Sequence, residues 1–291
     1  MALSSFPSQP GPQPFSGPPS PTPARPRSRS LRSALTDSLP YRQFRFWVTY
    51  QRRTLRGTIA SALLGPLLYL TAMGLGLGSL VNREHTLPGG ESFLVFVAPG
   101  VLAATAMQTA FGDATYPVLG AVKWVGNYWA AINTPQKPSD VLRGHAMFIL
   151  ARVTVITGFF LGIMAAFGAV PSWEGLLAWP AAVLTGMAFT LPIMAYAITL
   201  DADVPLSNLF RFVMTPLFLF SGTFFPWRQL PHWAYPIAFA TPLWHGTELC
   251  RSLTMGTATW GSVAIHVGYL VALTIAGLLI GQATYRRRLY V

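Results

Sequence analysis

Long apolar runs alternate with short polar breaks along this chain, at lengths that suit a lipid bilayer. A helix needs about 20 mainly apolar residues to cross the hydrocarbon core. Six runs approach or exceed that length, so the pattern predicts an all-α polytopic membrane protein with six transmembrane helices. The predicted spans are residues 58–80, 93–118, 147–170, 176–200, 209–225 and 262–285.

The apolar pattern breaks most sharply after the fifth predicted span. Residues 226–251 contain Pro231, Pro236 and Pro242 among several aromatic residues, and the apolar piece is too short to cross a bilayer comfortably. Aromatic side chains of this kind settle at the headgroup level. We therefore predict an extracellular re-entrant helical hairpin at 226–251, between spans five and six. The residues singled out for it are Phe224, Phe225, Trp227, Trp233, His245, Glu248 and Arg251.

The segment before the first span has a different pattern. Residues 38–56 place Phe44 and Trp47 at helical spacing, with Arg52 and Arg53 among the basic residues around them. This pattern predicts an amphipathic helix in the membrane interface, with its aromatic side toward the lipid. Residues 1–36 are rich in Pro, Ser and Arg and have little to bury, which predicts a disordered cytoplasmic tail.

Charge decides the orientation and the class of partner. The chain has 20 Lys and Arg against 9 Asp and Glu, and only 10% of its residues are charged. Fifteen of the basic residues fall on one side of the predicted topology and three on the other, which places both termini in the cytoplasm. A net charge of +11 could suit nucleic acid, but basic residues flanking apolar spans indicate membrane lipids as partners instead.

The connection at 119–146 is the longest cytoplasmic one. It holds a short amphipathic segment with Trp124, Tyr128 and Trp129, followed by a break at Asn133-Thr-Pro. Aromatic anchors dominate protein interfaces, so the segment could dock a partner. A surface helix lying among lipid headgroups is an equal alternative. Ser139 is a candidate cap for the span that follows, with Asp140 in its first turn.

Few residues carry candidate chemistry. Asp113 and Arg152 lie at matching depth in two spans and could form an ion pair, either structural or part of a gate. Glu248 and Arg251 are one helical turn apart and could also pair. His245 and Glu248 supply only two of the three ligands that a metal site needs, so no metal is expected. No catalytic set of acid, base and nucleophile lies at one depth.

Several motifs together resemble the ABC-2 permeases, in the branch of the nodulation lipo-oligosaccharide exporter and the daunorubicin-resistance permease. The resemblance covers roughly residues 40–291. Its motifs are Phe220-Ser-Gly-Thr-Phe-Phe-Pro226, Gln229-Leu-Pro-His-Trp233, Thr241-Pro-Leu-Trp-His-Gly-Thr-Glu-Leu-Cys-Arg251, Thr134-Pro135, Ser139-Asp140 and Gly144. Where related loops commonly have Gly-Glu, this chain has Gly144-His145, so a coupling role for that acidic position does not carry over.

The resemblance implies a transport subunit and no enzyme. Residues 37–291 would form the transmembrane domain, and 119–146 would be the loop that couples to an ABC ATPase present in two copies. A second permease chain, identical or a paralogue, would complete a bacterial exporter in the cytoplasmic (inner) membrane. No G-x-x-x-x-G-K-[ST] phosphate loop occurs in the sequence, so ATP and Mg would bind to the partner ATPase. No cofactor would bind to this chain. The substrate would be amphipathic: a drug, a lipid or a lipid-linked saccharide.

Two other classes of function remain open at this point. A membrane-embedded lipid or glycan transferase would need a cluster of acid, base or metal ligands facing a cavity. A membrane anchor without transport would recruit a cytoplasmic partner but would not need the broken outer hairpin.

Overall fold

The computed structural model describes residues 38–52, 92–224 and 235–290, together with residues 57, 64, 65, 67–72 and 76. The regular structure in these parts is entirely helical. The predicted tail at 1–36 lies outside the described residues, as do most of the predicted span at 58–80 and the first part of the predicted hairpin, 226–234.

Four stretches of described helix are long and apolar enough to cross a membrane: Phe93–Lys123, Pro138–Ala166, Trp173–Ala197 and Trp260–Leu289. They correspond to the predicted spans at 93–118, 147–170, 176–200 and 262–285. A shorter apolar run, Val204–Phe220, replaces the predicted span at 209–225. The named helices of these stretches are α5 (Phe93–Ala114), α6 (Tyr116–Lys123), α8 (Pro138–Ala166), η2 (Trp173–Leu177), α9 (Ala178–Ala197), α10 (Val204–Leu209), η3 (Phe210–Met214), α11 (Thr215–Phe220) and α14 (Trp260–Leu289).

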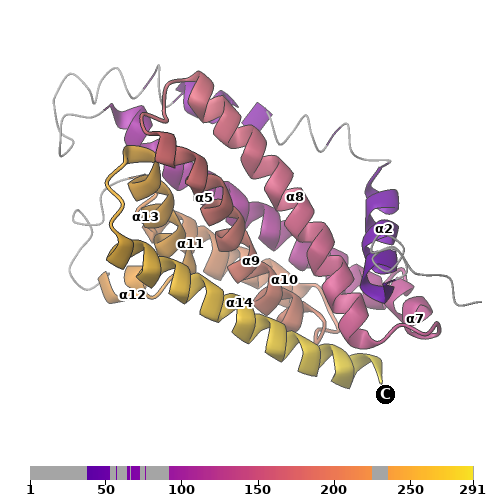
Figure 1. Cartoon of the computed structure of the whole chain (residues 1–291). Coiled ribbons are helices and arrows are strands. Elements are labelled where there is room, and N and C mark those ends of the chain that lie inside the picture. Colours follow the sequence, from indigo (N-terminus) through magenta and orange to yellow (C-terminus); the bar gives the residue numbers. More distant parts are fainter. Residues whose placement is uncertain are drawn as a thin grey trace, which may run out of the picture.

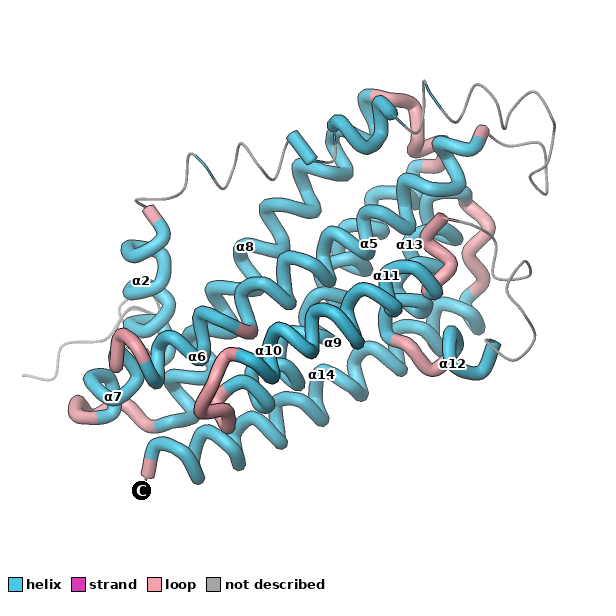
Figure 2. Tube along the Cα trace, turned by 180° about the vertical axis from the view of Figure 1, so that it is seen from behind, coloured by secondary structure: helices cyan, strands magenta, loops and turns pink. Residues whose placement is uncertain are grey.

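Helix α9 lies at the centre of the bundle and packs against α5, α8 and α14 (Figures 1 and 2). Small residues allow the close approaches. A Cβ atom added at Gly277 would lie 2.5 Å from the Pro192 ring, and one at Gly186 would lie 2.9 Å from Val153. Small residues bring helices together in the same way throughout membrane proteins. Close van der Waals packing of the helix backbones therefore stabilises the bundle, in addition to the burial of apolar side chains.

Two proline positions break the helices. Pro117 cannot donate a backbone hydrogen bond to the Asp113 carbonyl, and the helix is interrupted at Thr115, between α5 and α6. Pro216 likewise leaves the Phe212 carbonyl without a partner from its own turn, next to the π-helical stretch η3. The first break lies two residues after Asp113.

The bundle has two distinct ends (Figure 1). One end carries α2 (Leu39–Gln51), α7 (Asn127–Ile132) and the C-terminus of the chain, and the other carries α12 (Tyr235–Phe239) and α13 (Pro242–Met255). At the α2/α7 end, Asp201 forms ion pairs with Lys123 at 2.5 Å and with Arg288. Lys123 and Arg288 lower the pKa of this exposed carboxyl. The turn after α9 is thus tied to the ends of α6 and α14.

Candidate functional site

Among the described residues of the α2/α7 end, the most exposed aromatic side chain is that of Trp124, on the turn between α6 and α7. Trp124 and Val125 are each 63% exposed, and Asn133 is exposed where α7 ends. Gly126 adopts φ 70°, which lets the chain reverse between the two helices. The Trp129 indole donates a hydrogen bond of 3.1 Å to the Val122 carbonyl and so fixes α7 against α6. Trp124 is therefore an exposed side chain on a rigid base.

Tyr128 is buried, unlike Trp124, with which it was predicted to dock a partner. It is fully buried, and its hydroxyl forms a hydrogen bond of 2.5 Å with His145 Nδ1 and lies 3.4 Å from the Tyr285 hydroxyl. Burial, with a smaller contribution from Tyr285, raises the pKa of Tyr128. The prediction that Tyr128 docks a partner is wrong, because its own chain covers it. It holds α7 against α8 and α14 instead.

Helix α2 docks on the same cluster. Trp47 is 5% exposed and its ring stacks on His145 at 3.9 Å with an interplanar angle of 12°. A Cβ atom at position 144 would lie 2.4 Å from the Pro40 carbonyl oxygen, so Gly144 allows α2 to approach α8. The amphipathic helix is confirmed at Leu39–Gln51, but the prediction that Trp47 faces lipid is wrong, because α8 covers it.

The other residues predicted for this helix divide by position. Phe44 is half-buried and packs against the core, and Arg52 is exposed at the end of α2. Arg53 lies outside the described residues. Trp47, Tyr128, His145 and Tyr285 form what we call the aromatic cluster, which joins α2, α7, α8 and α14.

The start of α8 is fixed by an acidic side chain. Helix α8 begins at Pro138, and Asp140 accepts a hydrogen bond of 2.9 Å from the Lys137 backbone N–H. Asp140 lies in the first turn, as predicted, but the cap position belongs to Lys137. Ser139 is the second residue of α8, because the chain becomes helical earlier than the apolar pattern indicated.

Asp113 and Arg152 meet, as their matching depths predicted. Arg152 donates to Asp113 Oδ1 at 2.7 Å, and the pair joins α5 to α8 just before the break at Thr115. The second carboxylate oxygen, Oδ2, has no hydrogen-bond partner and is buried. A buried ion pair that loses one partner leaves an uncompensated charge, so the pair resists separation. Whether the pair also takes part in gating stays a prediction.

Arg251 connects three segments at the α13 end. Its guanidinium donates to Glu248 Oε1 at 2.6 Å, to the Gly222 carbonyl at 2.8 Å and to the Phe96 carbonyl at 3.2 Å. The group also lies 4.0 Å from the centre of the Phe96 ring, a cation–π contact. The predicted pair of Glu248 and Arg251 is present, and it extends to α5 and to the residues after α11. Arg251 is therefore a structural tie.

The remaining residues predicted for the hairpin have mixed outcomes. Phe224 packs edge-on against Phe218, with ring centres 5.0 Å apart, whereas Phe225, Trp227 and Trp233 lie outside the described residues. His245 Nδ1 lies 2.8 Å from His266 Nδ1, and His245 Nε2 donates to the Phe239 carbonyl at 3.0 Å. Among the described residues, no three His, Cys, Asp or Glu side chains are grouped so as to hold a metal.

Sequence reasoning missed His145, Tyr285 and His266 as members of polar clusters. Gly144-His145 was noted only as a departure from the family's loop motif, and the sequence alone did not indicate that His145 is buried. Tyr285 and His266 gave no comparable signal, because each lies in an apolar run and meets its partner only through packing.

Known proteins bear on this arrangement. Residues 42–255 match the family model described as ABC-2 type transporter. Nodulation protein J of Rhizobium leguminosarum bv. trifolii is 31% identical over 255 residues, covering 84% of this chain and 94% of that protein. Nodulation protein J of R. leguminosarum bv. viciae is 30% identical, and the match covers 80% of this chain and 88% of that protein. Nodulation protein J of Rhizobium meliloti (strain 1021) is 27% identical, and the match covers 85% of this chain and 91% of that protein. The chain belongs to the ABC-2 type transporter family and is the transmembrane component of an ABC exporter.

Proposed function

We propose that this chain is the permease subunit of an ATP-driven exporter that moves an amphipathic substrate across the cytoplasmic membrane of a bacterium. It would span the membrane six times, pair with a second permease chain, identical or a paralogue, and work with two copies of a separate ABC ATPase. ATP and Mg would bind the ATPase, because the permease sequence lacks a phosphate loop. The cargo class is a drug, a lipid or a lipid-linked saccharide.

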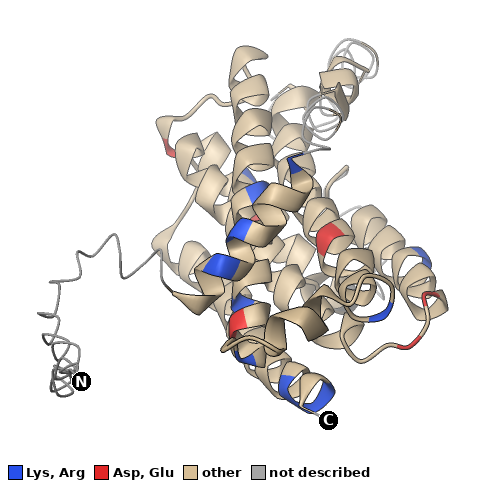
Figure 3. Ribbon diagram, turned by 90° about the vertical axis from the view of Figure 1, so that its right-hand side faces the viewer, with Lys and Arg blue, Asp and Glu red and all other residues tan. Residues whose placement is uncertain are grey.

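The charge distribution supports the orientation. Most of the described Lys and Arg residues, all except Arg152, Arg211 and Arg251, gather at the α2/α7 end, which Figure 3 views directly. They are Arg42, Arg45, Arg52, Lys123, Lys137, Arg143, Arg286, Arg287 and Arg288. Cytoplasmic segments next to spans carry this excess of positive charge. The α2/α7 end would face the cytoplasm, and the α13 end, with the re-entrant hairpin at 226–251, would face outward.

The observation that carries the proposal is the exposed Trp124 on its rigid base. A side chain that presents a large apolar surface to water, on a turn fixed by the Trp129 hydrogen bond, suits a groove on a partner protein. The aromatic cluster beneath it joins α7 to α2, α8 and α14. A push on α7 by the ATPase would therefore reach three further helices at once.

Substitution of this anchor tests the proposal. Trp124→Ala should weaken the complex with the partner ABC ATPase, because an interface anchor contributes about 2 kcal/mol or more, roughly a 30-fold change in affinity. Trp173→Ala is the matched control, since Trp173 is 79% exposed but begins η2 at the α13 end. The measurement is co-purification of the ATPase and its substrate-stimulated hydrolysis. Equal complex formation by Trp124→Ala and wild type would refute the coupling role of this turn.

A further inference from the structure

A cavity that opens to the surface lies between the start of α8 and the last three turns of α14. Its volume is about 600 Å³, within the ~300–1,000 Å³ that small-molecule sites occupy. Helix α14 turns one face toward it, because the lining residues recur at helical spacing: Leu279, Gln282, Ala283 and Arg286, with Tyr290 directly after the helix. Lys137, Pro138 and Ser139 line it from the start of α8.

The lining of this cavity changes from apolar to basic along α14. Leu279 is 61% exposed and lies in the apolar part of a helix long enough to cross a membrane, so this surface would face the acyl chains. Arg286 follows two turns later, about 10 Å further along the axis at a rise of 1.5 Å per residue. The cavity therefore crosses the level at which the hydrocarbon core gives way to the lipid headgroups.

The charge of the cavity favours an anion. Lys137 and Arg286 line it, and among the described residues no acidic side chain lines it and neither cation forms an ion pair. Asp140 is close in sequence, but its carboxylate accepts from the Lys137 backbone N–H. Arg288 is paired with Asp201 instead. An ammonium and a guanidinium that have no carboxylate to bind are suited to phosphate oxygens.

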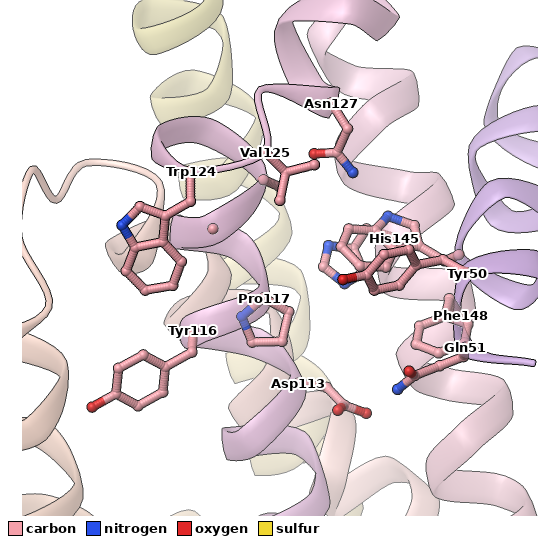
Figure 4. A pocket seen from close by; sticks show the side chains of 13 residues that line it. Tyr50, Gln51, Asp113, Tyr116, Pro117, Trp124, Val125, Asn127, His145 and Phe148 are labelled. Carbon is pink, nitrogen blue, oxygen red and sulfur yellow. The ribbon is translucent and has the colours of Figure 1, made fainter. Parts of the chain in front are cut away.

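The cavity beside α2 has a different character (Figure 4). Asp113, Tyr116 and Trp124 are among its lining residues, and among the described residues neither Lys nor Arg lines it. An acidic group without a basic one does not attract an anion. Of these two cavities at the α2/α7 end, the one between α8 and α14 is therefore the candidate anion site.

The occupant has to supply both an anionic group and an apolar chain. An anionic phospholipid of the bilayer supplies both, and basic pockets between transmembrane helices bind such headgroups. The N-terminal tail of the chain is an unsuitable occupant, because residues 1–36 contain four arginines and no acidic residue. Its charge would repel it from Lys137 and Arg286.

We propose that this cavity binds one anionic phospholipid of the surrounding bilayer, with its phosphate between Lys137 and Arg286 and one acyl chain beside Leu279. The lipid would bridge the start of α8 and the end of α14, two helices that the aromatic cluster also joins. It would be a resident lipid of the permease, distinct from the cargo, and its binding requires neither the ATPase nor transport.

Native mass spectrometry of the full chain in detergent tests the charge of the site. The probe is palmitoyl-oleoyl phosphatidylglycerol, and palmitoyl-oleoyl phosphatidylcholine, with the same acyl chains and no net charge, is the control lipid. We expect one tightly bound phosphatidylglycerol per chain. Lys137→Gln and Arg286→Gln should each weaken its binding about fivefold, and the double variant about 30-fold, the effect of basic residues near an anionic headgroup.

The matched control for charge is Arg287→Gln. It removes the same charge one residue further along α14, and Arg287 does not line the cavity. Phosphatidylglycerol binding should therefore stay close to the wild-type value. Equal affinity for the two lipids, or an equal loss of binding in Arg286→Gln and Arg287→Gln, would overturn the proposal.

A bulky substitution tests the space in the cavity without a change of charge. Ala283 lines the cavity and is exposed, so Ala283→Trp should fill it and displace phosphatidylglycerol. Ile265→Trp is the control, because Ile265 is 66% exposed near the other end of the same helix. Unchanged binding in Ala283→Trp, or an equal loss in Ile265→Trp, would overturn the assignment to this cavity.

A soluble phosphate distinguishes the lipid from a free anion. Glycerol 3-phosphate carries the anionic group without acyl chains, so millimolar concentrations should not displace phosphatidylglycerol. Displacement would identify a site for free phosphate and overturn the lipid assignment. None of these measurements involves the ATPase, so failure of the lipid site would leave the proposed permease function standing.

Discussion

The two ends of the bundle join their helices with different kinds of side chain. At the α13 end, Arg251 uses its guanidinium nitrogens to tie α13 to α5 and to the residues after α11. At the α2/α7 end, ring contacts of the aromatic cluster join four helices, and Trp124 lies exposed on the neighbouring turn. A guanidinium whose nitrogens are all paired fixes one arrangement of the helices that it joins, whereas an exposed aromatic anchor is suited to a partner protein.

Loss of the Arg251 tie should produce the largest effect on stability. Arg251→Ala leaves the Gly222 and Phe96 carbonyls without their donor and Glu248 without its charge partner. The side chain is 6% exposed, so we expect a loss of about 4 kcal/mol or more in the free energy of unfolding. Thermal unfolding in detergent measures it. The exposed Arg143→Ala should change little, and comparable effects of the two substitutions would remove the contrast between the ends.

A smaller effect is expected at the Asp113–Arg152 pair. Asp113→Asn should cost about 2 kcal/mol, because the amide keeps one hydrogen bond while Arg152, which is partly exposed, loses its counter-charge. A double-mutant cycle with Arg152→Gln measures the coupling between the two residues. Additive effects of the two substitutions would contradict a stabilising pair.

The same cycle resolves the open role of this pair. A purely structural pair predicts that the double mutant regains both stability and substrate-stimulated ATP hydrolysis. A gating pair predicts that the double mutant regains stability but not the stimulation. Unequal recovery of the two properties would therefore assign Asp113 and Arg152 to the transport cycle.

Much of this architecture could be predicted because the bilayer constrains length and depth. Four apolar runs correspond to helices that are long and apolar enough to cross a membrane. Matching depth paired Asp113 with Arg152, and one helical turn paired Glu248 with Arg251. The third span began earlier than predicted, since polar residues from Pro138 onward continue the helix beyond the apolar run.

The faces of the short helices could not be predicted in the same way. A hydrophobic pattern shows that one face of a helix is covered but not whether lipid or protein covers it. Trp47 was assigned to lipid and Tyr128 to a partner protein, yet α8 covers the first and α8 and α14 the second. The aromatic cluster likewise arises only from the packing of helices that are distant in sequence.

The central claim is that the α2/α7 end faces the cytoplasm and receives the ATPase, while the α13 end faces outward. Labelling of single cysteines with an impermeant maleimide tests this claim. The two cysteines are introduced one at a time into a Cys250→Ser chain, as Val125→Cys and as Trp260→Cys. Trp260 is 92% exposed at the start of α14. In intact cells, we predict that Trp260→Cys is labelled and Val125→Cys is not. In inverted vesicles, Val125→Cys should be labelled, and binding of the ATPase should block this labelling. Labelling of Val125→Cys from outside intact cells, or labelling in vesicles that the ATPase leaves unchanged, would contradict the account.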